Sequence, residues 1–422
     1  MLAINGGEKI GLVNTIKWPL WDSNTLVQLE SVLKSERWAI SGPWKGEKTK
    51  CEQFEELYAN FNNTKYCVAV DHGSSALLAA MQGLGIGPGD EVIIPALTWV
   101  ACIISVCNIN AVPIIADIDP DTYCISPDSI RKVITPKTKA IMPVHLYGCM
   151  TNMDEIMKIS KEFGLYIIED ASHSHGSMWR DKSAGAIGHA GCFSFQQGKV
   201  LTSGEGGAIL TADKNVYLRL LEIRTNSRIY KPQNECIIDH MHLKESGKIL
   251  GTNYNISEFQ AAILLDQLPK LEKLNRHKEE NAKYLDAELS KVSGVKPMYH
   301  DPCVTKQSYY RYCIKIDNSK FSNKPLARIC QALEAELGFV FEQPYPPLHK
   351  NILYRPETLQ TYKWNKEYYE KLMVHSNSYP VAEKAAFNEG IVFHHSYLLG
   401  TKQDMDNIIE AFNKVQLYSN EL

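Results

Sequence analysis

The chain has 422 residues, of which 44% are hydrophobic and 22% are charged, and its formal net charge is −3. These values are typical of a soluble globular protein that is long enough for one large and one smaller domain. The 45 Lys and Arg nearly balance the 48 Asp and Glu, without a long run of one sign, which excludes function by bulk attraction to nucleic acid or to an anionic membrane.

The sequence shows neither a signal peptide nor an apolar segment that could span a membrane. The N-terminus, MLAINGGEKIGLVN, lacks the basic start and apolar core of a signal peptide. The most apolar stretch, residues 102–116, is interrupted by Asn108, Asn110 and Pro113 and is too broken to span a bilayer. The 11 cysteines form no Cys-x-x-Cys motif and are interpreted as reduced core residues. We therefore expect a cytoplasmic protein.

Short apolar segments alternate with helical patterns through the first half of the chain. Strands are expected at residues 66–70, 91–96, 113–118, 140–146 and 165–169, and in the apolar run that ends at residue 195. Helices are expected to begin at Gly73 and at Ser126-Pro127, and one covers residues 153–163. This alternation predicts an α/β fold with a mostly parallel sheet that helices cover on both faces.

The second half of the chain begins with a long helical pattern. It starts at Ser257 and reaches Pro269, which lacks an amide hydrogen and should kink or restart the helix. We place the domain boundary at this point, with a large domain at residues 1–268 and a small C-terminal domain at residues 269–422. A strand at residues 309–316 and a helix at residues 325–337 indicate that the small domain is α+β.

Ligands of parallel α/β sheets bind outside the carboxyl ends of the strands, so the residues that follow each strand are the candidates for a site. One of these segments, Gly73-Ser74-Ser75, lies between a strand and a helix, where free amides and two hydroxyls favour a phosphate. Neither G-x-G-x-x-G nor G-K-[ST] is present, so the segment is neither a dinucleotide fingerprint nor a P-loop.

Three further residues follow strands, and each also has an ordinary structural explanation. Lys199 is explained as an exposed lysine in a glycine-rich turn, Asp170 as a helix cap and Trp99 as a packed ring. Together with the Gly73 segment, they supply the phosphate site, aromatic plate, carboxylate and lysine that pyridoxal 5′-phosphate (PLP) needs. The combination predicts a PLP site.

Histidine pairs raise the question of a metal. They are His173-x-His175, His240-x-His242 and His394-His395, and no cysteine or carboxylate stands beside them at a ligand spacing. We expect no bound metal.

Over nearly its whole length, the sequence resembles the DegT/DnrJ/StrS family of sugar aminotransferases. The matching stretches are DHGSSALLAAMQGLGIGPGDEVIIPALTW, PVHLYG, IIEDASHSHGS, FSFQQGK, GEGGAI and GTNYNISEFQAAILLDQL. The resemblance implies a fold-type I PLP-dependent aminotransferase. Its large domain would hold a mostly parallel seven-stranded sheet flanked by helices, and its C-terminal domain would be the smaller α+β part.

The resemblance also implies roles for the residues that match the family's motifs. Lys199 forms the Schiff base with PLP, Asp170 pairs with its pyridine nitrogen and Trp99 stacks on its ring. The phosphate ligands implied within the chain are Gly73, Ser74 and Ser194.

Two further matches involve the phosphate and the ring oxygen. The family's asparagine that reaches the phosphate of the neighbouring subunit matches Asn253, which implies a homodimer with shared sites. His173 replaces the usual glutamine near the phenolic oxygen of PLP, and a histidine can titrate near neutral pH. Asn255 replaces the arginine of the family's N-Y-R motif, so any substrate contact of that arginine is lost.

Three stretches resemble the branch of the family that aminates cyclitols, the L-glutamine:2-deoxy-scyllo-inosose aminotransferases of aminoglycoside biosynthesis. They are RWAISGPWKGE, FSFQQGKVLTSGEGG and HHSYLLG. The implied activity moves an amino group from L-glutamine or L-glutamate to a ring ketone. Two alternatives stay open, a nucleotide-diphosphate ketosugar aminotransferase and a non-catalytic PLP-binding regulatory protein. The keto acceptor, the choice of donor and a second amination step also stay open.

Substrate contacts are expected from residues outside these motifs. Arg224 and Arg228 are candidates for the donor carboxylate, which a guanidinium binds bidentately, and surface ion pairs are the alternative for both. The other candidates for substrate contacts are Trp38, Tyr345, His349, His394 and His395.

Overall fold

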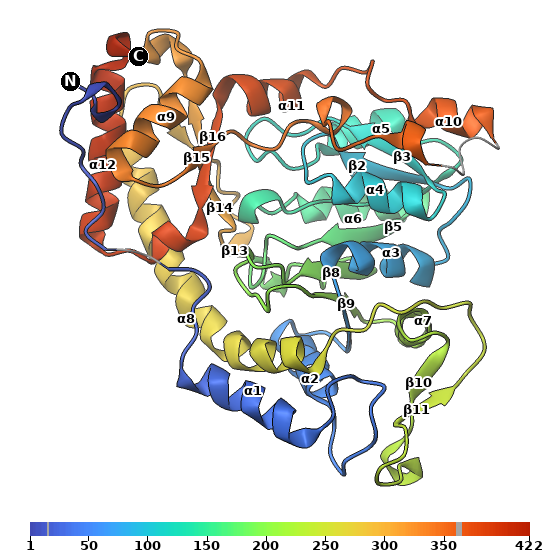
Figure 1. Cartoon of the computed structure of the whole chain (residues 1–422). Coiled ribbons are helices and arrows are strands. Elements are labelled where there is room, and N and C mark those ends of the chain that lie inside the picture. Colours follow the sequence, from blue (N-terminus) through green and yellow to red (C-terminus); the bar gives the residue numbers. More distant parts are fainter. Residues whose placement is uncertain (15–16, 360–364) are drawn as a thin grey trace.

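A central seven-stranded sheet organises the protein, shown in Figure 1 as a computed structural model that describes residues 1–14, 17–359 and 365–422. The strands lie in the order β1 (Tyr66–Val70), β9 (Gly207–Thr211), β8 (Ala190–Ser194), β5 (Tyr166–Asp170), β4 (Thr138–Ile141), β2 (Glu91–Pro95) and β3 (Val112–Ala116). β9 is antiparallel to both neighbours, whereas the other pairs are parallel. The expected mostly parallel sheet is confirmed.

Helices cover both faces of this sheet because alternate strand residues point to opposite sides. Val68 and Val70 of β1 belong to the core on one face, and Cys67 and Ala69 belong to the core on the other. The first core includes residues of α3 (Gly73–Gly83), α4 (Ala101–Asn108) and α7 (Lys214–Arg224). The second includes residues of α2 (Lys50–Phe61), α5 (Pro127–Val133), α6 (Met153–Phe163) and α8 (Glu258–Leu289).

The small body is built on a four-stranded antiparallel sheet. Its strands lie in the order β12 (Val295–Pro297), β14 (Arg311–Ile316), β16 (Gly390–His394) and β15 (Phe341–Glu342). α9 (Leu326–Leu337), α12 (Lys402–Leu417) and the C-terminal half of α8 pack on it, and both chain ends lie at this body in Figure 1.

Other helices and strands lie outside these two sheets and the helices already named. They are α1 (Ser23–Ser35), α10 (Lys366–Leu372), α11 (Pro380–Lys384), a two-stranded ribbon of β10 (Arg228–Tyr230) and β11 (Leu243–Glu245), and a three-stranded ribbon of β6 (Met178–Trp179), β7 (Lys182–Ser183) and β13 (Val304–Lys306).

α8 is one helix where the sequence predicted an interruption. Its N-cap is Ser257, and the helix continues through Pro269. The expectation that the helix restarts at Pro269 is therefore wrong. The proline removes one amide donor, but Leu268 and Leu271 beside it are buried against the core of the large sheet. Burial of these side chains offsets the lost hydrogen bond.

The division into domains at residues 268 and 269 stays a prediction, and packing crosses that boundary in both directions. Leu2 is buried in the core of the small body, whereas Leu348, Leu372 and Ala382 are buried in the core of the large sheet. Each predicted domain therefore contributes residues to the core of the other.

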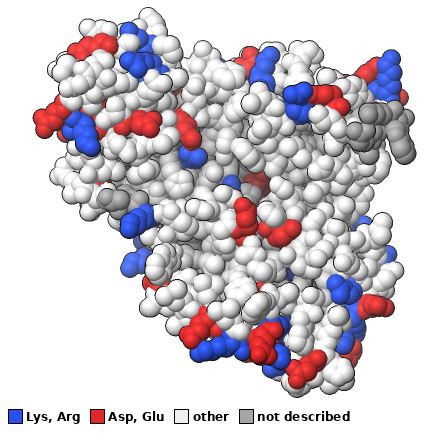
Figure 2. Space-filling model, in the orientation of Figure 1, with Lys and Arg blue, Asp and Glu red and all other residues white. Residues whose placement is uncertain are grey.

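The surface carries no dominant charge on the face shown in Figure 2, where Lys and Arg alternate with Asp and Glu. Within the described ranges, no helix has both the length and the apolar character to cross a membrane. None of the 11 cysteines, all of which lie in the described ranges, forms a disulfide, and nine of them are buried.

Candidate active site

A cavity of about 410 Å³ opens at the carboxyl ends of β1, β2, β5 and β8, where the small body meets the large sheet. It brings together eight residues that the sequence singled out, namely Gly73, Ser74, Trp99, Asp170, His173, Ser194, Lys199 and Tyr345. Five segments far apart in the sequence thus meet at one edge of the sheet, as the rule for parallel sheets predicts.

Lys199 lies in the turn after β8, where its amide donates to the carbonyl of Gln196 (2.8 Å). Its Nζ lies 4.2 Å from the ring centre of Tyr310. Burial lowers the pKa of Lys199, although the nearby Tyr310 and Asp170 oppose this shift. A lowered pKa increases the fraction of uncharged amine, which is the form that attacks a carbonyl and accepts a proton.

Asp170 ends β5 and is only 7% exposed. Its Oδ2 accepts a hydrogen bond from the Cys102 thiol (3.2 Å), and its Oδ1 accepts one from the Ser172 amide (3.1 Å). Burial raises the pKa of the Cys102 thiol, which therefore stays protonated as a donor. Neither contact is with a cation, so this buried carboxylate fits a protonated ring nitrogen.

The N-terminus of α3 has the form of a phosphate cradle. The N-cap residue, His72, makes no side-chain hydrogen bond to the first amides of the helix. A Cβ atom on Gly73 would lie 2.6 Å from Cβ of Ser194, so glycine allows α3 to approach β8. The hydroxyls of Ser74 and Ser194 line the same cavity. Helix amides and hydroxyls at one point suit the phosphate of PLP.

His173 is buried in a stack of rings. Its Nδ1 accepts a hydrogen bond from the Tyr147 amide (3.3 Å), so Nε2 carries the proton. The imidazole lies parallel to the Tyr310 ring, with centroids 4.0 Å apart. Burial, and then the charge of Lys199, lower the pKa of His173 well below its usual value. Of the two behaviours open to a histidine here, burial therefore favours the neutral ring over one that titrates near neutral pH.

Trp99 reaches the cavity from the segment after β2. It is 47% exposed, and its ring centre lies 5.4 Å from that of Tyr345. A half-exposed indole at the mouth of the cavity is available to stack on a bound aromatic ring.

Two cavity residues that the small body contributes, Tyr310 and Arg311, escaped the sequence reasoning. Tyr310 and Arg311 stand at the start of β14 and reach the cavity from the small body. The segment SYYRY before that strand is the signal, but its position in a separate predicted domain concealed it. Cys102, whose thiol donates to Asp170, was also missed, because its sequence pattern is that of a buried core residue of α4.

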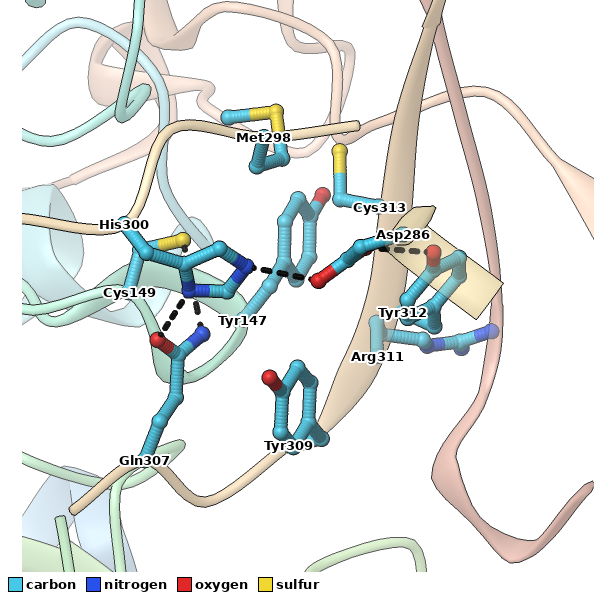
Figure 3. Close-up of a pocket in the computed structure, with 10 residues that line it drawn as sticks. All are labelled: Tyr147, Cys149, Asp286, Met298, His300, Gln307, Tyr309, Arg311, Tyr312 and Cys313. Carbon is cyan, nitrogen blue, oxygen red and sulfur yellow. Dashed lines mark hydrogen bonds and ion pairs between the residues drawn. The ribbon is translucent and has the colours of Figure 1, made fainter. Parts of the chain in front are cut away.

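A second cavity, of only about 10 Å³, is lined in part by Arg311 and has room for about one water molecule. Figure 3 shows its polar cluster, in which Asp286 accepts from Tyr312 (2.6 Å) and bonds His300 (2.9 Å). His300 in turn bonds Gln307 (2.8 Å). The cavity is too small for a substrate, and its network fixes β14 to α8.

Two other candidates have internal partners in place of a substrate. Arg224 is buried, forms an ion pair with Glu55 and donates to the Ala69 carbonyl (3.1 Å). His349 is buried with its Nε2 on Glu383 (2.8 Å). Both side chains are thus held by partners within the same chain.

The remaining candidates do not line the cavity of the chain that carries them. His394 and His395 place Nε2 near the carbonyl of Gly198 (3.2 and 3.3 Å) and so contact the turn that carries Lys199. Trp38 and Asn253 are exposed and Arg228 is partly exposed. None of the three lines the cavity.

The sequence pattern of the DegT/DnrJ/EryC1/StrS aminotransferase family matches residues 21–413. The chain belongs to this family. It is 39% identical over 417 residues to the L-glutamine:2-deoxy-scyllo-inosose aminotransferase of Streptomyces kanamyceticus, with 98% of this chain and 96% of that protein covered. It is 37% identical over 415 residues to the L-glutamine:scyllo-inosose aminotransferase of Streptomyces griseus, with 98% and 97% covered.

A solved aminotransferase from Psychrobacter cryohalolentis has the same fold as this DegT-family chain. The TM-score is 0.80 at 26% identity, with 96% of this chain and 99% of that chain covered. The fold expected from the resemblance is thus confirmed. This DegT-family protein is a transaminase, and membership in the family implies that it depends on PLP.

Proposed function

We propose that this aminotransferase moves the amino group of L-glutamine, or of L-glutamate, to a ring ketone of a cyclitol such as 2-deoxy-scyllo-inosose in aminoglycoside-type biosynthesis. The observation that carries the proposal is the 39% identity over 98% of the chain to an enzyme named for that donor and acceptor. The Streptomyces griseus relative is named for scyllo-inosose, so this second cyclitol ketone belongs in the same test.

The cavity residues fit PLP in defined roles. Lys199 would bind its aldehyde carbon as a Schiff base, and the α3 amides with Ser74 and Ser194 would hold its phosphate. Trp99 would cover a face of the ring, and Nε2 of His173 would donate to the phenolic oxygen. When bound, PLP supplies an electron sink for the electron pair left at the donor α-carbon.

Two side chains carry the proton chemistry. Lys199 accepts the proton from the α-carbon of the donor amino acid, because burial lowers its pKa and favours the free amine. Such positioned proton transfer contributes roughly 10²–10⁴-fold to the rate. The buried carboxylate of Asp170 would stabilise a proton on the ring nitrogen of PLP, because a nearby anion favours the protonated form. The same two residues serve the acceptor half of the reaction.

We also propose that the active form is a homodimer with shared sites. Asn253 is exposed and does not line the cavity of its own chain. The family resemblance pairs it with an asparagine that reaches the phosphate in the neighbouring subunit. A homodimer would bring this exposed residue to the phosphate site of the partner subunit.

The test uses the purified, PLP-saturated enzyme with L-glutamine and three acceptors. They are 2-deoxy-scyllo-inosose, scyllo-inosose and a nucleotide-linked 4-ketosugar. We expect kcat/KM for a cyclitol ketone to exceed that for the ketosugar by about 100-fold or more, because a site that fits one acceptor leaves the other's polar groups unpaired. Preference for the ketosugar would replace the cyclitol proposal with the nucleotide-sugar alternative.

The role of Lys199 is tested separately by borohydride reduction followed by denaturation. The wild type should retain covalently attached PLP absorbance, and Lys199→Ala should retain none. Lys214→Ala, a change at an exposed lysine of α7, is the matched control and should behave as the wild type. Retained covalent absorbance in Lys199→Ala would place the Schiff base on another lysine.

A further inference from the structure

The charges of the cavity leave one side chain without a role in the proposed chemistry. Of the residues described as lining it, two are lysine or arginine, Lys199 and Arg311. Lys199 is committed to PLP and to proton transfer, and His173 is held neutral by burial. An amino acid donor brings an α-carboxylate into this buried space, where a carboxylate without a cationic partner is costly.

We propose that Arg311 binds the α-carboxylate of the amino donor and so selects amino acids over simple amines. This inference rests on the transaminase activity of the chain and not on the identity of the keto acceptor. A guanidinium is suited to the task, because its planar fork of N–H groups matches a carboxylate bidentately.

The position of Arg311 supports this role. Its guanidinium carbon lies 5.7 Å from the ring centre of Tyr310, the ring whose centre is 4.2 Å from Nζ of Lys199. Nζ of Lys199 and the Arg311 guanidinium therefore lie beside one aromatic ring, an arrangement that suits the amine and the α-carboxylate of one amino acid. Figure 3 shows the Arg311 side chain directed away from the polar cluster around His300.

The contacts of Arg311 orient the guanidinium and leave part of it free for a ligand. Nη1 pairs with Oε2 of Glu342, whose side chain is 47% exposed, whereas that of Arg311 is 19% exposed. A guanidinium has five N–H groups, so the ion pair through Nη1 and a hydrogen bond to the Tyr310 hydroxyl do not exhaust its donors. The more exposed Glu342 thus binds the Nη1 end of the Arg311 guanidinium.

The two arginines that the sequence suggested for the carboxylate do not serve it within the chain. Arg224 is closed off by Glu55, and Arg228 bonds the Thr225 carbonyl (3.2 Å) and Sδ of Met241 (3.8 Å) on the β10 side of the molecule. Arg311 is the guanidinium that lines the cavity.

The test measures binding without turnover. Apoenzyme is titrated calorimetrically with two reduced adducts, N-(5′-phosphopyridoxyl)-L-glutamine and N-(5′-phosphopyridoxyl)-4-aminobutanamide, which differ only by the α-carboxylate. We expect the wild type to bind the glutamine adduct about 100-fold more tightly, as a charge-assisted bidentate contact predicts. Arg311→Gln should lose this preference and bind the 4-aminobutanamide adduct and PLP itself with wild-type affinity.

Further variants distinguish the proposal from its alternatives. Arg219→Gln is the matched control, since that guanidinium bonds the Gln82 carbonyl away from the cavity, and it should keep the preference. Arg311→Lys, which keeps the charge but not the fork, should show an intermediate preference and guards against misfolding of Arg311→Gln. A preference retained in Arg311→Gln, or lost in Arg228→Gln, would overturn the assignment.

The outcome is independent of the acceptor. A failure of the enzyme to aminate any cyclitol ketone would refute the cyclitol proposal and leave the adduct titrations intact. Equal weakening of both adducts by Arg311→Gln would instead indicate a structural role for Arg311 and would also overturn the proposal.

Discussion

His173 is a buried, neutral histidine at a position where the family resemblance implies glutamine. The Tyr147 amide donates to Nδ1, and burial lowers the pKa of the ring well below its usual value, which favours the neutral ring between pH 6 and 8. A glutamine amide supplies the same donor. We therefore expect His173→Gln to retain kcat/KM within about threefold, with an unchanged pH profile over this range.

The measurement is the pH dependence of kcat/KM for both proteins. His173→Ala, which lacks the donor, serves as the comparison and should lose about 10-fold or more in activity. An acid limb in the wild type with a pKa between 6 and 8 that disappears in His173→Gln would contradict the neutral assignment.

Residues of the site were predictable where they follow strands of the large sheet. Asp170 and Ser194 end apolar strands and Lys199 lies in the turn after the second of them, so one topological rule places them at the same edge. Tyr310 and Arg311 were not predictable in this way, because they reach the cavity through packing of a second sheet. No local pattern encodes that packing.

At the scale of the element, the start of α3 depends on one missing side chain. A Cβ atom on Gly73 would lie 2.6 Å from Cβ of Ser194, so Gly73→Ala must separate α3 from β8 at the proposed phosphate site. We expect Gly73→Ala to weaken PLP binding by about 10- to 100-fold, equivalent to 1–3 kcal/mol of overpacking. Titration of the apoenzyme with PLP measures this change.

Gly87→Ala provides the matched control, because a Cβ atom there has no heavy atom within 4 Å. It should bind PLP as the wild type does, and thermal unfolding of both apoproteins should exclude a general loss of structure. Wild-type PLP affinity in Gly73→Ala would show that the α3 amides do not hold the phosphate.

The elements themselves were largely predictable from apolar periodicity and capping residues. α6 covers the residues expected, and Ser126 caps α5, accepting from the Ser129 amide (3.3 Å). The prediction failed at Pro269, because it weighed one lost hydrogen bond and could not weigh the burial of Leu268 and Leu271. Tertiary packing decided the outcome.

At the scale of the whole molecule, the small body helps to shape the site. His394 and His395 of this body contact the Gly198 carbonyl, next to Lys199, and Tyr345 contacts Trp99. The segment around Leu348, close to Tyr345 in the chain, packs in the core of the large sheet. The site contacts and this packing therefore belong to the same interface between the two bodies. The sequence predicted two bodies but not which segments cross between them.

The proposed shared site makes a prediction about mixed dimers. Lys199→Ala removes a residue that acts in its own chain, whereas Asn253→Asp places a negative charge against the phosphate of the partner's site. Oδ1 of Asn253 accepts from the amide and Nδ2 of Asn255 (3.3 and 2.6 Å), and an aspartate accepts both, so the local fold should persist. Each variant alone should be nearly inactive.

Co-expression of the two variants in equal amounts tests this arrangement. Half of the dimers should be mixed, and each mixed dimer should contain one site with neither defect, so about one quarter of wild-type activity should return. Lys199→Ala mixed with Asp170→Asn is the control, because both residues line the cavity of one chain and no intact site can form. Equal activity of the two mixtures, or a monomer by sedimentation, would refute shared sites, because recovery requires that Asn253 act across the interface.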